Sequence, residues 1–138
     1  MSTPVSKCTV FIQVWVDTHA IHPASSRGIY LVDRRRGRGC RGHLAGNMQT
    51  TVARNARICW TVLPVDPAFT AAGGTLRMQS IGNSSAWGVG GQPQMVDAMT
   101  FTGTACTAGT ASYHIGIDVQ LPGKSSMTLS LNPRVTVD

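Results

Sequence analysis

The stretch VFIQVWV, residues 10–16, most strongly constrains what this chain can fold into. Valine or isoleucine occupies every second position, and Phe11, Gln13 and Trp15 lie between them. A period of two places these two sets on opposite faces of a β-strand. Because the second set is also partly apolar, we expect a strand in the middle of a sheet.

The same alternation recurs along the chain, with prolines or glycines between the segments. Its spacing of about 8–12 residues is typical of a β-sandwich or jelly roll. We therefore predict about eight or nine short antiparallel strands, with reversals at residues 53–56 (ARNA) and at Pro122–Gly123. Besides residues 10–16, the expected strands are residues 28–33, 48–52, 58–62, 75–82, 98–103, 112–121, 126–131 and 134–137.

The acidic residues also favour a β-protein. All six are aspartate, and the chain has only two lysines. Glutamate and lysine are good helix formers, so their scarcity disfavours helices, and no 3.6-residue period stands out. No stretch resembles a linker between domains. We predict an all-β protein that forms one jelly-roll-like β-sandwich domain over residues 1–138.

The densest charge lies in DRRRGRGCRGH, residues 33–43. Five arginines fall in this stretch: Arg34, Arg35, Arg36, Arg38 and Arg41. They form a candidate site for a polyanion such as nucleic acid or a sulfated glycan. Nucleic acid is disfavoured, because the rest of the chain is nearly neutral and no aromatic residue lies within the stretch. The alternative is a solvated hairpin tip whose charge aids solubility.

Four cysteines, Cys8, Cys40, Cys59 and Cys106, leave the redox state open. Their even number permits two disulfides, but no pair has the spacing of a zinc site. Cys59 falls within an apolar strand pattern, where a free cysteine behaves as a small hydrophobic residue. We favour reduced cysteines, with at least one disulfide as the alternative.

The sequence contains no recognised catalytic motif. Its histidines and aspartates occur in none of the settings of known hydrolases. His19 and His22 have the spacing of a metal-ligand pair, but a zinc site needs further ligands. The glycine-rich GVGGQPQ lacks the lysine and the helix of a phosphate-binding loop. We predict no enzyme activity, no metal and no cofactor.

The N-terminal residues MSTPVSKCTVFIQVWV lack the basic and apolar regions of a signal peptide. No apolar run in the chain is long enough to span a membrane. We expect a cytoplasmic protein, or one that is released without a signal peptide.

Trp87 stands alone among small residues in SSAWGVGG. Its ring either packs over the end of the sandwich, which we favour, or is exposed as a stacking surface for a sugar. Trp15 and Trp60 lie in strand patterns and are expected in the core.

Several stretches, in this order, resemble the AidA/PixA family of bacterial inclusion-body proteins: FIQVWVDTHAI, GIYLVD, ICWTVLPVDP and YHIGIDVQLPGK with MTLSLNPRVTV. The resemblance covers nearly the whole chain, and its strongest part is ICWTV with the proline-containing bend after it. It implies a compact β-sandwich that is oligomeric, abundant in the cytoplasm and able to form inclusions. It supplies no catalytic residues. The chain departs from the family pattern at Asn132–Pro133, where members tend to have Asp-Pro, and in its arginine run.

Three functions remain open. The first is a non-catalytic AidA/PixA-like protein that accumulates or is released for host interaction, with glycan binding as a further activity. Its glycan site is predicted at polar loop residues beside an aromatic ring: Trp87, Asn83, Gln92 and Asp97. The second is polyanion binding through Arg34–Arg41. The third is a self-assembling structural or storage protein, for which a homo-oligomer is expected.

Overall fold

The computed structural model describes residues 5–21, 27–35, 39–44, 49–82 and 84–138, with the backbone alone at residues 35 and 39–44. These residues form twelve strands and a single 3-10 turn, η1 (Val5–Lys7). The predicted all-β class is confirmed. Within the described part of the chain, no helix is long and apolar enough to cross a membrane.

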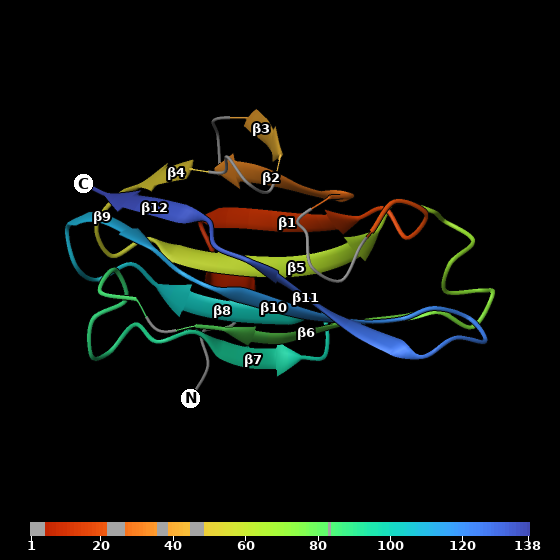
Figure 1. The fold of residues 1–138 in the computed structure, drawn as a ribbon. Helices are drawn as coiled ribbons and strands as arrows, with labels where there is room; N and C mark the ends of the chain where they lie inside the picture. Colours follow the sequence, from red (N-terminus) through yellow and green to blue (C-terminus); the bar gives the residue numbers. More distant parts are fainter. Residues whose placement is uncertain (1–4, 22–26, 36–38, 45–48, 83) are drawn as a thin grey trace.

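The larger sheet has six strands in the order β3-β2-β1-β5-β8-β7. Figure 1 looks onto its face, with β3 at the top and β7 at the bottom. Strand β1 lies in the interior of the sheet, as its sequence pattern predicted, and its residues alternate between buried and half-buried. The six strands are β1 (Val10–Val16), β2 (Ile29–Arg35), β3 (Gly39–Leu44), β5 (Arg57–Pro64), β7 (Gln94–Asp97) and β8 (Thr100–Thr104).

The opposing layer is built around one long hairpin. One arm contains β9 and β10, and the other contains β11 and β12. Ser112 pairs with Arg134 and Ile115 pairs with Leu131, so both halves of the hairpin keep the same register across a short break. β6 extends this layer beside β10, and β4 extends it beside β12. These strands are β4 (Gln49–Val52), β6 (Thr75–Ile81), β9 (Gly109–Ser112), β10 (Ile115–Gln120), β11 (Ser126–Leu131) and β12 (Arg134–Val137).

The strands differ from the prediction in number and in direction. Twelve replace the expected eight or nine, partly because the arginine stretch supplies β3 and because residues 112–121 are interrupted near Tyr113. Two pairs, β1 with β5 and β4 with β12, are parallel rather than antiparallel. The predicted turn at residues 53–56 is present, with Asn55 at a φ of 68°, but it carries the chain from one layer to the other. Hydrophobic periodicity reports only which face of a strand is buried, so it does not reveal these pairings.

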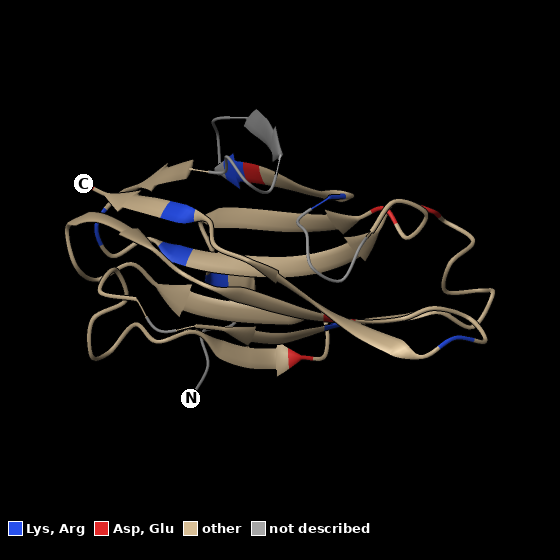
Figure 2. Cartoon of the chain, in the orientation of Figure 1, with Lys and Arg blue, Asp and Glu red and all other residues tan. Residues whose placement is uncertain are grey.

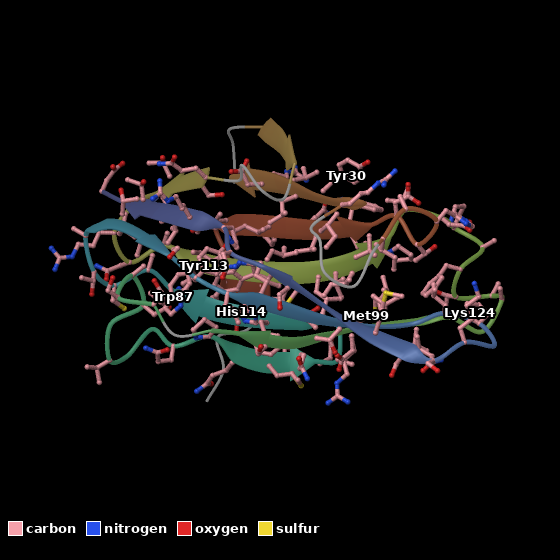
Figure 3. The ribbon with its side chains drawn as sticks, viewed as in Figure 1. Tyr30, Trp87, Met99, Tyr113, His114 and Lys124 are labelled. Carbon is pink, nitrogen blue, oxygen red and sulfur yellow. The ribbon has the colours of Figure 1, made fainter. Side chains whose placement is uncertain are left out.

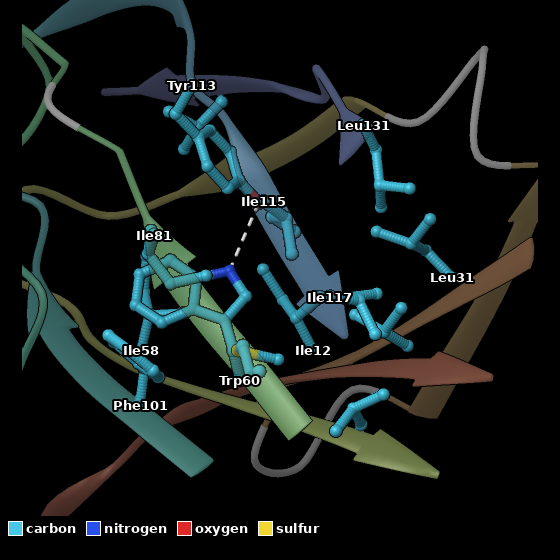
Figure 4. Packing of buried hydrophobic residues seen from close by; sticks show 14 of the residues in the cluster. Ile12, Leu31, Ile58, Trp60, Ile81, Phe101, Tyr113, Ile115, Ile117 and Leu131 are labelled. Atoms are coloured by element: carbon cyan, nitrogen blue, oxygen red, sulfur yellow. Dashed lines mark hydrogen bonds between the residues drawn. The ribbon is translucent and has the colours of Figure 1, made fainter. Parts of the chain in front are cut away.

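The core lies between the two layers, and three aromatic rings meet within it; Figure 3 labels two of them, Trp87 and Tyr113, and Figure 4 labels Trp60 beside Tyr113. Trp60, Trp87 and Tyr113 pack edge to face, with ring centroids 5.2–5.9 Å apart. Trp60 donates its indole N–H to the Tyr113 hydroxyl over 3.2 Å. Burial raises the pKa of Tyr113 above its usual value, so this hydroxyl stays protonated. The predicted core position of Trp60 is correct, whereas Trp15 lies half-buried on the outer face of its sheet.

A buried polar contact connects the layers beside this core. Thr50 on β4 donates its hydroxyl to Oδ2 of Asp33 on β2 over 2.9 Å. Both residues are nearly inaccessible to solvent. An unpaired carboxylate is costly in such a site, so the hydrogen bond favours one fixed position of β4 against β2.

Candidate functional site

The outer face of the larger sheet, which points away from the core, carries the candidate site. Phe11 on β1 lies directly opposite Arg34 on β2 and Cys59 on β5. Cys59 in turn lies opposite Thr102 on β8. Paired residues on neighbouring strands turn their side chains to the same face. One row of side chains therefore crosses four strands, from a cation through an aromatic ring and a thiol to a hydroxyl.

A cavity of about 310 Å³ opens on this face above β1, β2 and β5. We call it the outer-face cavity. Ligand pockets in proteins begin at about 300 Å³, so its volume suits a small molecule. The described part of the lining combines an aromatic ring, a thiol, neutral polar groups and a cation. It is formed by Phe11, Ile12, Gln13, Arg34, Cys59 and Thr61.

The polar groups of this cavity retain free hydrogen-bonding capacity. Gln13 accepts the indole N–H of Trp15 at 3.2 Å through its carbonyl oxygen, which leaves its NH₂ group as a donor. Arg34 is exposed, and it forms no ion pair or side-chain hydrogen bond with other described residues. Its guanidinium offers five donors and a permanent positive charge.

Cys59 forms an inert part of the lining. Burial, together with a hydrogen bond to Cys8 and the charges of Cys8 and Asp97, raises the pKa of its thiol to about 12. The thiol therefore stays protonated near neutral pH and is a poor nucleophile. Among the described residues, Cys8, Cys59 and Cys106 form no disulfide, in line with the favoured reduced state, and the side chain of Cys40 lies outside the described residues.

A second, smaller cavity of about 50 Å³ lies towards β7 and β8. Thr102 lines it, and the Thr102 hydroxyl is buried with no hydrogen-bond partner in the described part of the chain. Buried polar groups are nearly always paired. A space of this volume accommodates a water molecule, so the small cavity suits a polar guest.

The residues predicted for a glycan site are not brought together around an exposed ring. Trp87 is fully buried, and its indole N–H donates to the Gly82 carbonyl at 3.1 Å. It packs beside Tyr113, so its ring is not a stacking surface for a sugar (Figure 3). Of the two roles considered for Trp87, packing is the one that the structure shows. Gln92 and Asp97 are exposed, and Gln92 lines the smaller cavity. Asn83 lies outside the described residues.

The predicted polyanion site is described only in part. Arg34 and Arg35 belong to β2 and Arg41 to β3, so the stretch is mostly a strand pair rather than a loop. The side chains of Arg35 and Arg41 are not described, and Arg36 and Arg38 lie outside the described residues. Figure 2 shows further basic residues on the left of the view, among them those at the start of β5 and of β12.

The histidine pair considered for a metal has another arrangement. His19 Nε2 lies 2.9 Å from Oδ2 of Asp66, and this contact lowers the pKa of the Asp66 carboxyl. His22 lies outside the described residues. The described ranges contain no group of three or more His, Cys, Asp or Glu side chains arranged to hold a metal ion.

The outer-face cavity was not predicted from the sequence. A weak signal for it was the mixed second face of residues 10–16, where Phe11 and Gln13 alternate with the buried set. Its other lining residues come from β2 and β5, and only the strand pairing places them beside β1.

Comparison with known proteins identifies a similar fold and the family of this chain. The fold resembles that of PixA, an inclusion body protein from Burkholderia cenocepacia J2315, with a TM-score of 0.65 over 99% of this chain and 100% of that chain. The two sequences are 10% identical, so the likeness concerns the fold alone. Residues 8–127 match a family described as a domain of unknown function, DUF8788, and the chain belongs to this family. No curated protein matches the chain.

Proposed function

We propose that this chain is a non-catalytic, PixA-like protein that associates with itself and accumulates as inclusions in the cytoplasm. The observation that carries the proposal is the fold likeness to an inclusion body protein over essentially the full length of both chains. The sequence resemblance to AidA/PixA proteins supports the same assignment. We further propose that residues 1–138 act as one β-sandwich domain.

One strand edge supports self-association. β11 and β12 form one arm of the long hairpin, and β4 pairs with the β12 half only. No described strand pairs with the outer edge of β11. An unpaired strand edge exposes backbone N–H and C=O groups that can join the strand of another copy. We call this surface the β11 edge.

The β11 edge lacks the features that usually prevent such pairing. Its sequence, SMTLSL, has no charge and no proline, and its pairing with β10 is regular throughout (Figure 2). The other free edges are less suitable: β7 has a bulge and ends in Asp97, β6 carries Arg77, β3 carries Arg41, and β4 and β9 are four residues long. Charges, bulges and short strands are the common means of blocking edge pairing. The β11 edge is therefore the best candidate for contact with a second copy.

An antiparallel pair of β11 edges related by a two-fold axis gives a dimer as the first assembly step. If the pair is centred on Thr128, Ser126 of one copy faces Ser130 of the other. Both serines are exposed. Replacing both by lysine places like charges opposite each other, which opposes pairing without burying a charge in the core.

The proposal is tested by producing the protein in bacterial cells and examining the cells by electron microscopy. We expect inclusions for the wild-type chain, and few or none for the Ser126→Lys, Ser130→Lys double variant. The matched control is Ser85→Lys with Ser125→Lys, two exposed serines outside the strands, which adds the same charge. If the wild-type protein stays dispersed at high abundance, the proposed function is wrong. If the edge variant and the control form inclusions equally, assembly does not use the β11 edge.

A further inference from the structure

The outer-face cavity contains the complementary groups of a binding site for a small charged molecule. Among the described residues of its lining, Arg34 is the one that carries a charge, and it has no ion-pair partner in the described part of the chain. Phe11, directly opposite Arg34, supplies an apolar wall, while Gln13 and Thr61 supply neutral polar groups. A guanidinium binds carboxylate and similar planar or oxygen-rich anions through paired hydrogen bonds.

We propose that the outer-face cavity binds a small organic anion, with its acidic group on Arg34 and its apolar body against Phe11. The donor groups of Gln13 and Thr61 are placed to hydrogen-bond oxygen atoms of the same molecule. The size of the cavity, about 310 Å³, limits the guest to a small molecule of up to about three rings or a short acyl chain. The proposal does not depend on self-association.

Charges elsewhere on the face favour one orientation of the guest. Asp97 lies on the far side of Cys59 from Arg34, and its negative charge acts on the Cys59 thiol. An anion is therefore attracted towards β2 and repelled from β7. Cys59 itself stays neutral and offers a small apolar surface between them.

Two fluorescent probes that differ in charge test the proposal. The anionic probe is 8-anilino-1-naphthalenesulfonate, and the neutral probe is N-phenyl-1-naphthylamine, which has the same rings without the sulfonate. Titration should show saturable binding of the anionic probe at one site per chain. Arg34→Ala should weaken this binding about tenfold, the loss of one charge-assisted contact, and leave neutral-probe binding within about twofold.

The matched control is Arg134→Ala, which removes an exposed arginine on β12 in the other layer. It should bind both probes as the wild type does. Thr61→Phe, which fills the cavity, should abolish binding of both probes; circular dichroism confirms that each variant is folded. The proposal is overturned if Arg34→Ala and Arg134→Ala bind the anionic probe equally, if Thr61→Phe still binds it, or if no saturable site exists. Probe binding is also measured on the Ser126→Lys, Ser130→Lys variant. Unchanged binding there would show that the anion site does not depend on self-association.

Discussion

Trp60 on β5 and Tyr113 at the break between β9 and β10 join the two layers through a hydrogen bond of 3.2 Å within the core. Both side chains are buried, and each ring also contacts Trp87 edge to face. The contact therefore fixes the distance between the layers as well as satisfying the indole N–H. The outer-face cavity lies on the opposite side of the same sheet, beside Cys59, the neighbour of Trp60 in the chain.

Tyr113→Phe is expected to leave the Trp60 indole N–H without an acceptor in the core. A buried donor without a partner costs about 1–3 kcal/mol of unfolding free energy. Urea unfolding followed by circular dichroism measures this loss. Tyr30→Phe, at an exposed position on β2, removes the same hydroxyl and should change the unfolding free energy by less than about 0.5 kcal/mol. Equal stability of the two variants would show that the hydrogen bond contributes nothing.

Trp87→Ala is expected to destabilise the fold strongly, because Trp87 has no exposed surface. Removing a buried tryptophan side chain costs about 3–5 kcal/mol. Trp15→Ala, at a half-buried position, should cost clearly less in the same urea titration. A small loss of unfolding free energy in Trp87→Ala would instead indicate that Trp87 is exposed and available for ligand binding, the alternative considered from the sequence.

Gly91→Ala is expected to destabilise the turn between residues 88 and 93. A Cβ atom at this position would overlap the carbonyl oxygens of Thr104 and Trp87. Forcing a methyl group into such a contact costs about 1–3 kcal/mol. The neighbouring Gly90 has open space around its Cα, so Gly90→Ala should be close to neutral in thermal unfolding. The prediction fails if both variants melt at the wild-type temperature.

His19 and Asp66 should make a contribution to stability that depends on pH. The hydrogen bond from His19, and a second from the backbone N–H of Ala68, lower the pKa of Asp66. A lowered carboxyl pKa stabilises the fold above the ordinary value of about 3.9, and this contribution is lost as the pH falls through the folded pKa. His19→Gln should raise the Asp66 pKa in an NMR titration. His114→Gln, whose ring bonds to Ser130 instead of a carboxylate, should leave it unchanged.

The cysteines should differ in their reactivity towards a thiol reagent at pH 8. Burial raises the pKa of Cys59 to about 12, and Cys8 is also fully buried, whereas Cys106 is half-buried. In a Cys40→Ser background, we expect Cys106 to react first and the other two only after denaturation. Fast labelling of Cys59 in the folded protein would contradict its burial and its hydrogen bond to Cys8.

The sequence predicted the class of fold because burial of one strand face requires apolar residues at alternate positions. The alternation in residues 10–16 and the apolar positions of residues 115–119 correspond to buried residues in the structure. It did not predict which strands pair. The parallel contact of β1 with β5, formed by residues more than forty positions apart, leaves no local pattern.

The outer-face cavity was beyond prediction for the same reason. The sequence indicated Arg34 only as one member of a basic run. Its place opposite Phe11 and beside Gln13 depends on the register of the strands. Trp87 attracted attention as a lone aromatic residue among small ones. Its burial depends on contacts with Trp60 and Tyr113, which lie 27 and 26 positions away in the chain.

Sedimentation velocity across a wide range of protein concentrations tests the central claim, self-association through the β11 edge, most directly. The account predicts that the sedimentation coefficient of the wild-type protein rises with concentration. The Ser126→Lys, Ser130→Lys variant should stay monomeric, and the Ser85→Lys, Ser125→Lys control should follow the wild type. A wild-type protein that remains monomeric at every concentration, or an edge variant that associates as strongly as the control, would contradict it.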